Sequence, residues 1–292
     1  DRVTVLRDGE NAGELEKEEI NHDNMVRLMV GRELSEFYSR KIHQLGDVVL
    51  RANKIISPAH PEIQVSIEVR SGEIVGIAGL VGAGRTELLQ TIFGVTPALG
   101  GDMELDGEIF RPTCPADAIS AGIALAPEDR KKHGLVLPMT VRENSSLPSL
   151  EKDQRKGFLD QAKEIQVADH AVKQMSIKTP SIEQIAKFLS GGNQQKIVLG
   201  KWLAMNPKLL MLDEPTRGID IGAKREIYNL METLAAEGMA ILFVSSEMEE
   251  VLGMADRAYV MHEGRISGEL TRDELSEESI MNLATGAESS AA

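Results

Sequence analysis

The chain has 292 residues, of which 42% are hydrophobic and 27% charged, and its formal net charge is −14 at pH 7. This composition is typical of a globular protein with a hydrophobic core, and its apolar runs are far shorter than the ~20 residues of a membrane-spanning helix. The negative charge argues against a nucleic-acid partner, because phosphate backbones attract basic surfaces. The single cysteine, Cys114, excludes an internal disulfide and indicates a reducing compartment.

Two segments of the chain repeat in register. Residues 1–9 read DRVTVLRDG and residues 256–264 read DRAYVMHEG, an offset of 256 − 1 = 255. At the same offset Leu28 aligns with Leu283 and Gly31 with Gly286. A match that keeps its register this far indicates an internal repeat. We therefore expect four parts, which are the C-terminal tail of a preceding homologous domain over 1–31, a linker over 32–45, a main domain over 46–285 and a flexible tail over 286–292.

Along the main domain, apolar runs alternate with helical periodicity. Alternating and short apolar runs predict strands over 47–56, 62–69, 73–78, 102–110 (a hairpin turning at 106–107), 123–126, 208–213 and 239–244. The region 140–187 reads as mainly helical, and Ser181–Gln184 has the spacing of a capping box, which predicts a helix start there. Strands that alternate with helices predict an α/β fold with a largely parallel sheet covered on both faces.

A glycine-rich segment lies between a predicted strand and a predicted helix. Gly79 to Thr86 reads GLVGAGRT. In this setting the pattern G-x-x-x-x-G-K-[ST] is a phosphate-binding loop, whose backbone N–H groups surround an anion and whose helix N-terminus adds its dipole. Arg85 stands where the pattern has lysine. The sequence therefore predicts a phosphate site with an altered cation.

Two later motifs make this prediction more specific. Residues 189–196 read LSGGNQQK, and an apolar strand ends in Asp213-Glu214. In this order, the three motifs resemble the nucleotide-binding domain of ATP-binding cassette (ABC) proteins over about 47–268. GAGRT, PEDRK, LSGGNQQK, DEPTRGID and SSEM are similar to the second cassette of tandem ATP-binding subunits of bacterial ribose, arabinose, xylose and galactose importers. The resemblance implies a P-loop NTPase of ABC type, with a mostly parallel core sheet, an antiparallel β subdomain and a helical subdomain.

The resemblance also implies roles for individual residues. ATP would be bound by Gly79, Gly82, Ala83, Gly84, Arg85, Thr86, Glu128 and Ser246. Mg²⁺ would be held by Thr86 and Asp213, and Glu214, beside Asp213, would orient or deprotonate the attacking water. The signature motif would act on a nucleotide held by a companion cassette through Ser190, Gly191, Gly192, Asn193 and Gln194. Asp220 would link the two sites.

The motifs depart from the general ABC pattern at four points. Arg85 replaces a compact ammonium with a bulky planar fork. Glu128 stands where glutamine is usual, and its carboxylate would repel phosphate unless Mg²⁺ or Arg130 screens it. Ser246 stands where histidine is usual, and no aromatic residue lies between Tyr38 and Phe93 to stack on adenine. We therefore expect this cassette's own site to be weak or non-hydrolytic, while its signature motif serves the companion.

The resemblance implies an ATP hydrolase that energises sugar uptake in the complete protein, peripheral to the cytoplasmic face of the membrane. Its partners would be a companion cassette, membrane-spanning permease subunits and, indirectly, a sugar-binding protein. Contacts with the permease are expected at 128–132 and over 140–187. Two alternatives remain, a soluble ABC ATPase acting on ribosomes or DNA and a purely regulatory nucleotide-binding module. The sequence does not specify the sugar.

Overall fold

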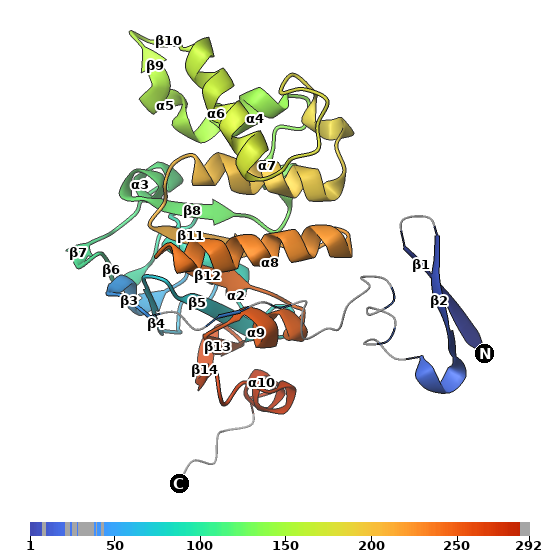
Figure 1. Cartoon of the computed structure of the whole chain (residues 1–292). Helices are drawn as coiled ribbons and strands as arrows, with labels where there is room; N and C mark the ends of the chain where they lie inside the picture. Colours follow the sequence, from blue (N-terminus) through green and yellow to red (C-terminus); the bar gives the residue numbers. More distant parts are fainter. Residues whose placement is uncertain are drawn as a thin grey trace.

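Figure 1 shows the computed structural model, which describes residues 1–7, 10–20, 24, 28, 38, 40–41 and 44–286. Most of the predicted linker over 32–45, the predicted tail after Gly286, and Gly31 lie outside the described residues. Within the described part of the chain, the helices are all too short or too polar to cross a bilayer.

A six-stranded sheet forms the centre of the main domain, in the order β14-β13-β5-β12-β11-β8. Its parallel strands are β5 (Ile74–Gly79), β8 (Ile123–Ala126), β11 (Leu209–Asp213), β12 (Ala240–Val244) and β13 (Arg257–His262). The strand β14 (Arg265–Thr271) closes one edge antiparallel to β13. Every residue of β8, β11 and β12 is buried, as expected for parallel strands covered on both faces. The predicted parallel sheet is confirmed.

Helices cover this sheet on the side seen in Figure 1 and behind it. Here α8 (Ile221–Ala236) and α9 (Met248–Met254) lie in front of the strands. The helix α2 (Arg85–Ile92), which directly follows the glycine-rich loop, packs against β5 and β11. The remaining helices of the core are α3 (Pro115–Ala121), which contacts β8, and α10 (Glu277–Ala284), which contacts β13.

A separate antiparallel sheet has the order β4-β3-β6-β7. Its strands are β3 (Val48–Ile56), β4 (Val65–Arg70), β6 (Gly100–Leu105) and β7 (Glu108–Ile109). Asp106 and Gly107 join β6 to β7, and both have positive φ, +52° and +77°. Two left-handed residues in a two-residue loop match the right-handed twist of the hairpin strands. The predicted hairpin and its turn are confirmed.

A helical subdomain forms the upper part of Figure 1. It contains α4 (Val141–Ser146), α5 (Leu150–Asp153), α6 (Gln161–Gln174) and the hairpin β9 (Gln154–Arg155) and β10 (Phe158–Leu159), and it packs on α7 (Gly191–Leu203). Short helical turns are η1 (Lys17–Glu19), η3 (Arg130–Gly134), η4 (Leu147–Ser149) and η5 (Ala186–Phe188).

The predicted helix start at Ser181 is wrong. The start of α4 uses the backbone of this segment, because Val141 N donates to Gln184 O and Arg142 N donates to Ile182 O, both at 2.9 Å. The Glu183 carboxylate pairs with the Arg142 guanidinium at 2.7 Å, which ties the segment to α4 a third time. The capping box of this region is formed at α4, between Thr140 and Glu143.

The N-terminal hairpin repeats the geometry of β13 and β14. Its strands β1 (Arg2–Arg7) and β2 (Glu10–Glu16) have the bounds of β13 and β14 moved by 257 − 2 = 255. The pairing register and the irregularity after the fourth residue are the same in both hairpins. A Cβ atom on Gly13 would meet Leu28 at 2.9 Å, and one on Gly268 would meet Leu283 at 2.7 Å. The two hairpins therefore share a fold as well as a sequence pattern.

Candidate functional site

A hollow of about 360 Å³ lies where the carboxyl ends of β5, β11 and β12 meet, the usual place for a ligand in an open parallel sheet. It is lined by Val81, Gly82, Ala83, Gly84, Arg85, Thr86, Glu87, Glu128, Glu214, Arg217 and Ser246. Most of the predicted ATP-binding residues thus come together around one cavity. Gly79 and Asp213 lie outside its lining, and Glu87 and Arg217 were missed by sequence reasoning.

The glycine-rich loop wraps one side of this hollow. Gly82 and Gly84 have φ of +82° and +96°, a backbone region that favours glycine, and α2 begins directly after Gly84. Gly79 has φ of +150°, and a Cβ atom there would lie 2.5 Å from the backbone oxygen of Met261. The loop can therefore place backbone N–H groups and a helix N-terminus beside an anion.

Arg85 is turned inward beneath the loop. Its residue is only 8% exposed, and its Nη1 donates to the backbone oxygen of Ser245 at 2.6 Å. Its Nη2 lies 3.6 Å from Glu214 Oε1. Burial lowers the pKa of the Arg85 guanidinium, while the carboxylates of Glu214 and Asp213 act in the opposite direction. The guanidinium thus faces the acidic end of β11 in this structure.

Thr86 and Asp213 offer a small oxygen-ligand set. The Thr86 hydroxyl donates to Asp213 Oδ1 at 3.1 Å, and Asp213 is 3% exposed. Burial raises the pKa of Asp213 to about 6, although the hydrogen bond from Thr86 lowers it. Hydroxyl and carboxylate oxygens are ligands that Mg²⁺ prefers, and Mg²⁺ usually completes its shell with phosphate and water. Within the described part of the chain, groups of three or more His, Cys, Asp or Glu suited to a metal are absent. Thr86 and Asp213 therefore fit a metal ion that is bound together with a phosphate ligand. Such an ion would neutralise the negative charge of the phosphate.

Glu214 is held in a strained turn with both of its carboxylate oxygens engaged. Its φ is +49°, a left-handed conformation that is uncommon for a residue with a side chain. Its Oε2 accepts a hydrogen bond from the Ser246 hydroxyl at 2.9 Å, and its Oε1 faces Arg85. Such strain persists only where the surroundings determine the conformation, and it is common at functional sites.

The cation beside Glu128 is Arg217, whose guanidinium forms an ion pair with the Glu128 carboxylate. Arg130, which the sequence offered beside Mg²⁺ as a screen for Glu128, has other partners. Arg130 instead donates to the backbone oxygens of Arg217 at 2.9 Å and of Gly218 at 3.2 Å. The ion pair of Glu128 with Arg217 joins residues far apart in the chain, and the sequence around either residue does not predict it.

The signature residues lie outside this hollow. Ser190 caps α7, is exposed, and accepts a hydrogen bond from Asn193 Nδ2 at 2.9 Å. Asp220 caps α8, and a Cβ atom on Gly192 would meet Ala223 at 2.7 Å, so the starts of α7 and α8 are in contact. Gln194 is 4% exposed, and its side-chain amide donates to the backbone oxygens of Ala186 and Leu189. These two hydrogen bonds hold the backbone at 186–189, directly before α7, from its buried side.

His60 was also missed by sequence reasoning. Its imidazole packs on the glycine-rich loop, since a Cβ atom on Gly84 would lie 2.9 Å from His60 Nε2 and one on Gly264 only 2.4 Å from its Cγ. The ring adjoins the start of α2, in a chain segment that lacks Phe, Trp and Tyr. Nothing in the spacing of the six histidines distinguishes it.

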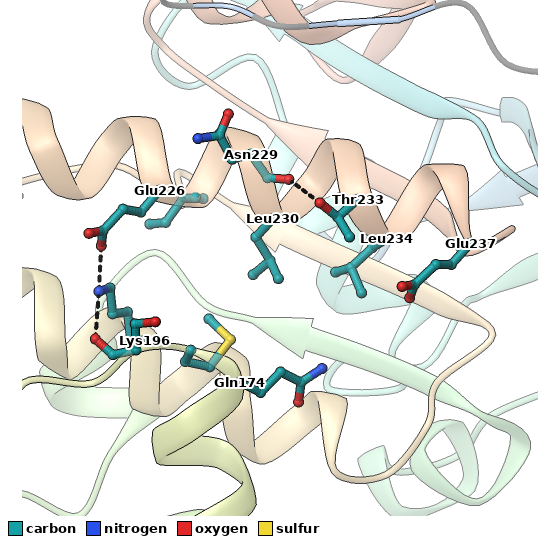
Figure 2. A pocket seen from close by; sticks show the side chains of 11 residues that line it. Gln174, Lys196, Glu226, Asn229, Leu230, Thr233, Leu234 and Glu237 are labelled. Carbon is teal, nitrogen blue, oxygen red and sulfur yellow. Dashed lines mark hydrogen bonds and ion pairs between the residues drawn. The ribbon is translucent and has the colours of Figure 1, made fainter.

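Another hollow, of about 410 Å³, lies between the end of α6, α7 and α8 (Figure 2). Apolar side chains such as Leu230 and Leu234 face it, and Lys196 forms an ion pair with Glu226 at one end. None of the predicted phosphate-binding residues lines it. The motifs therefore point to the hollow at the glycine-rich loop.

Comparison with solved structures confirms the fold. A nucleotide-free ATP-binding cassette from an ABC transporter matches 82% of this chain and 96% of its own, with a TM-score of 0.67 and 25% identity. A structure of an ABC-transporter cassette in its ADP conformation matches 82% of this chain and 99% of its own, with a TM-score of 0.66 and 25% identity. The predicted P-loop fold of ABC type, with its parallel core, antiparallel sheet and helical subdomain, is thus confirmed.

Sequence comparison gives the family. The family model described as ABC transporter matches residues 63–217, more than half of the chain. Proteins named "Ribose import ATP-binding protein RbsA" are 48% identical over 98% of this chain in Yersinia pestis and 47% identical over 98% in Geobacillus kaustophilus. The chain covers 56% and 58% of these two relatives, so it spans little more than half of their length. It belongs to the ABC transporter family.

Proposed function

We propose that this chain is part of an ATP-binding subunit that energises sugar uptake, and that the hollow at the glycine-rich loop binds Mg-ATP. The observation that carries the proposal is the gathering of Gly82–Thr86, Glu128, Glu214 and Ser246 around one cavity at the carboxyl ends of the core strands. The choice of sugar uptake is supported by the relatives, whose names describe ribose import. Thr86 and Asp213 would hold the Mg²⁺.

ATP hydrolysis is proposed for the complete protein, with this cassette's own site weak or non-hydrolytic. Glu214 would serve as the residue that orients the attacking water. In the present arrangement its Oε2 accepts from Ser246 and its Oε1 faces Arg85, so both oxygens already have partners. A water molecule would have to replace one of these partners. Arg85 would likewise have to leave the Ser245 oxygen to reach a phosphate.

The signature motif would act on a nucleotide bound by a companion cassette. Ser190 is exposed at the N-terminus of α7, where a hydroxyl and backbone N–H groups can meet a phosphate. We further propose that residues 1–31 are the end of such a preceding cassette. Support comes from the common bounds, register and irregularity of the hairpins β1-β2 and β13-β14.

The proposed partners are permease subunits in the membrane, with a sugar-binding protein acting through them, so the chain would sit at the cytoplasmic face. The helical subdomain supports this proposal, because it exposes large apolar side chains, with Phe158, Phe188 and Leu159 at 78%, 70% and 58% exposure. Co-purification of the full-length protein tests it. Capture of hydrophobic permease subunits is expected, and capture of ribosomes or DNA instead would favour a soluble ABC ATPase.

Titration calorimetry of this chain with Mg-ATP tests the nucleotide site. Micromolar binding is expected, and Thr86→Val is expected to weaken it while leaving the fold unchanged. A folded chain that binds no nucleotide up to millimolar concentration would contradict the proposal.

A second assay measures phosphate release. Turnover at rates typical of enzymes that is lost in Glu214→Gln would refute the proposal of a weak or non-hydrolytic site.

A further inference from the structure

A buried carboxylate lies behind the nucleotide site and gathers hydrogen bonds from three chain segments. Glu250, on α9, is 1% exposed. Its Oε1 accepts from the Thr216 hydroxyl and, at 2.5 Å, from the Tyr228 hydroxyl, and its Oε2 accepts from the Ser245 hydroxyl at 2.7 Å. Lys224 Nζ lies 3.4 Å from Oε1. A buried carboxylate is tolerated only with such partners, and hydrogen bonds to a charged group are stronger than neutral ones.

Two of these partners flank the residues that face the hollow. Thr216 follows Glu214 by two positions, and Ser245 directly precedes Ser246, whose hydroxyl donates to Glu214. The backbone oxygen of Ser245 accepts the hydrogen bond from Arg85. Glu250 itself is absent from the lining of the hollow. From behind the hollow, Glu250 therefore holds the segment that carries Glu214 and the segment that carries Ser246.

The strained turn at Glu214 gives this support a purpose. The φ of +49° at Glu214 is unfavourable by itself, so neighbouring contacts must hold it. The backbone N–H of Glu214 donates to Val244 O at 3.0 Å, which ties the turn to the end of β12, and the next residue along the chain is Ser245. Fixing Ser245 and Thr216 on one carboxylate restrains the turn from two directions.

Tyr228, one of the partners of Glu250, also contacts the segment that precedes the main domain. The Tyr38 ring lies 5.2 Å from the Tyr228 ring, the two side chains are hydrogen-bonded, and Tyr38 packs on Gly253 of α9. Nearby, Arg40 is 4% exposed at its side chain and pairs with Glu232 at 2.7 Å and with Asp256. The chain entering the domain is thus fixed to α8 and α9, in contact with the hydroxyl that supports Glu250.

We propose that Glu250 is a positioning residue for the nucleotide site and that Tyr38 supports it through Tyr228. The proposal rests on the proposed function in so far as the hollow binds nucleotide. Glu250 keeps Glu214, Ser246 and Arg85 in the arrangement seen here. Loss of the Tyr228 hydroxyl, or of its contact with Tyr38, loosens that arrangement without touching the hollow.

The test compares two buried tyrosines in this 292-residue chain. Tyr228→Phe removes a hydrogen bond to Glu250 and keeps the ring. Tyr259→Phe is the matched control, because its hydroxyl is also buried but accepts from Arg257 and from Glu68 N, outside the cluster. Hydrogen exchange is measured without nucleotide at the backbone amides of Glu214, which donates to Val244 O, and of Glu247, which donates to the Ser245 hydroxyl oxygen at 3.0 Å. We expect about tenfold faster exchange in Tyr228→Phe than in the control, at matched melting temperature.

Nucleotide affinity provides the second measurement. We expect Tyr228→Phe and Tyr38→Phe to weaken Mg-ATP binding about fivefold, while Tyr259→Phe leaves it unchanged. Glu250→Gln should weaken Mg-ATP binding less than Tyr228→Phe does, because the amide oxygen of the glutamine can still accept a hydrogen bond from Thr216 or Tyr228. Equal exchange rates in Tyr228→Phe and the control would overturn the positioning role. A wild-type chain that fails to bind nucleotide would count against the proposed function alone, since the exchange measurement needs no nucleotide.

Discussion

The hollow at the glycine-rich loop and the signature segment differ in how their polar groups are partnered. Around the hollow, Arg85 and Ser246 both engage Glu214, and Arg217 pairs with Glu128. The Ser190 hydroxyl, by contrast, is exposed and bonds only to Asn193 among the described residues. A ligand at the hollow must displace partners within the chain, whereas one at Ser190 meets a group that already faces outward. The altered residues of the hollow thus satisfy one another.

The largest expected effect concerns backbone constraint at the glycine-rich loop. A Cβ atom on Gly79 would lie 2.5 Å from the Met261 backbone oxygen, so the neighbouring strand would have to move. We expect Gly79→Ala to lower the free energy of unfolding by about 4 kcal/mol. Gly82→Ala is the control, because it also has positive φ but nothing lies within 4 Å of its Cβ position. It should cost only about 1 kcal/mol in chemical denaturation, and equal costs would contradict this account.

The next effect tests a contact between α7, which starts at the signature segment, and the chain that follows Glu128 of the hollow. Lys201 lies near the end of α7, 7% exposed, and donates to the backbone oxygen of Gly134 in the segment that follows Glu128. Burial lowers the pKa of Lys201 to about 8. Between this value and the ~10.4 of an unfolded lysine, the unfolded chain binds more protons than the native one, so stability contributed by this group rises with pH.

Lys201→Met removes this titration. The stability of the wild type relative to Lys201→Met should rise by about 2 kcal/mol between pH 7 and pH 10. Urea unfolding of both proteins at the two pH values measures it, and the subtraction cancels the other titrating groups. A difference that stays constant with pH would show that the native Lys201 has an ordinary pKa.

A smaller effect is expected at the two signature glycines, where the nearest atom to an added Cβ belongs to a side chain and not to a strand backbone. A Cβ atom on Gly192 would lie 2.7 Å from the Ala223 methyl, which cannot swing away. One on Gly191 would meet Arg130 Nη2 at 2.7 Å, the end of a flexible side chain, and the backbone oxygen of Gly218 less closely, at 3.1 Å. We expect Gly192→Ala to cost about 1.5 kcal/mol, and Gly191→Ala clearly less. Thermal unfolding decides the order, and a larger cost for Gly191→Ala would disprove the reasoning.

The features that sequence reasoning predicted correctly depend on local pattern. The strands β8, β11 and β12 are apolar runs buried on both faces, and the turn at Asp106-Gly107 needs two residues that accept positive φ. The glycine-rich loop could be located because its glycines have the spacing of a phosphate-binding loop and the segment lies between a predicted strand and a predicted helix. In each case the physical cause lies within about ten residues of the feature.

The features that it missed depend on contacts between distant segments. The motif at Ser181 has the spacing of a cap, but α4 takes the carbonyl groups of Ile182 and Gln184. The pairing of Glu128 with Arg217 and the packing of His60 on Gly84 join segments that only the fold brings together. Spacing along one segment contains no information on such competition, because the competing groups come from elsewhere in the chain.

The smallest expected effect returns to the acidic residue of the hollow. Arg217 and Glu128 are 65% and 37% exposed at their side chains, so their ion pair contributes little to folding. Both line the hollow, however, and without Arg217 the Glu128 carboxylate would face the phosphates unpaired. Arg217→Ala should weaken Mg-ATP binding about threefold, more at low ionic strength than at high.

The double variant Arg217→Ala/Glu128→Gln separates repulsion from lost attraction. If Arg217 acts by neutralising Glu128, removing the carboxylate as well should return the affinity for Mg-ATP to near that of the wild type, as measured by titration calorimetry. If Arg217 instead binds phosphate directly, the double variant should remain as weak as Arg217→Ala. The second result would mean that the hollow holds an unpaired cation once nucleotide enters, and that its charged residues do not simply satisfy one another.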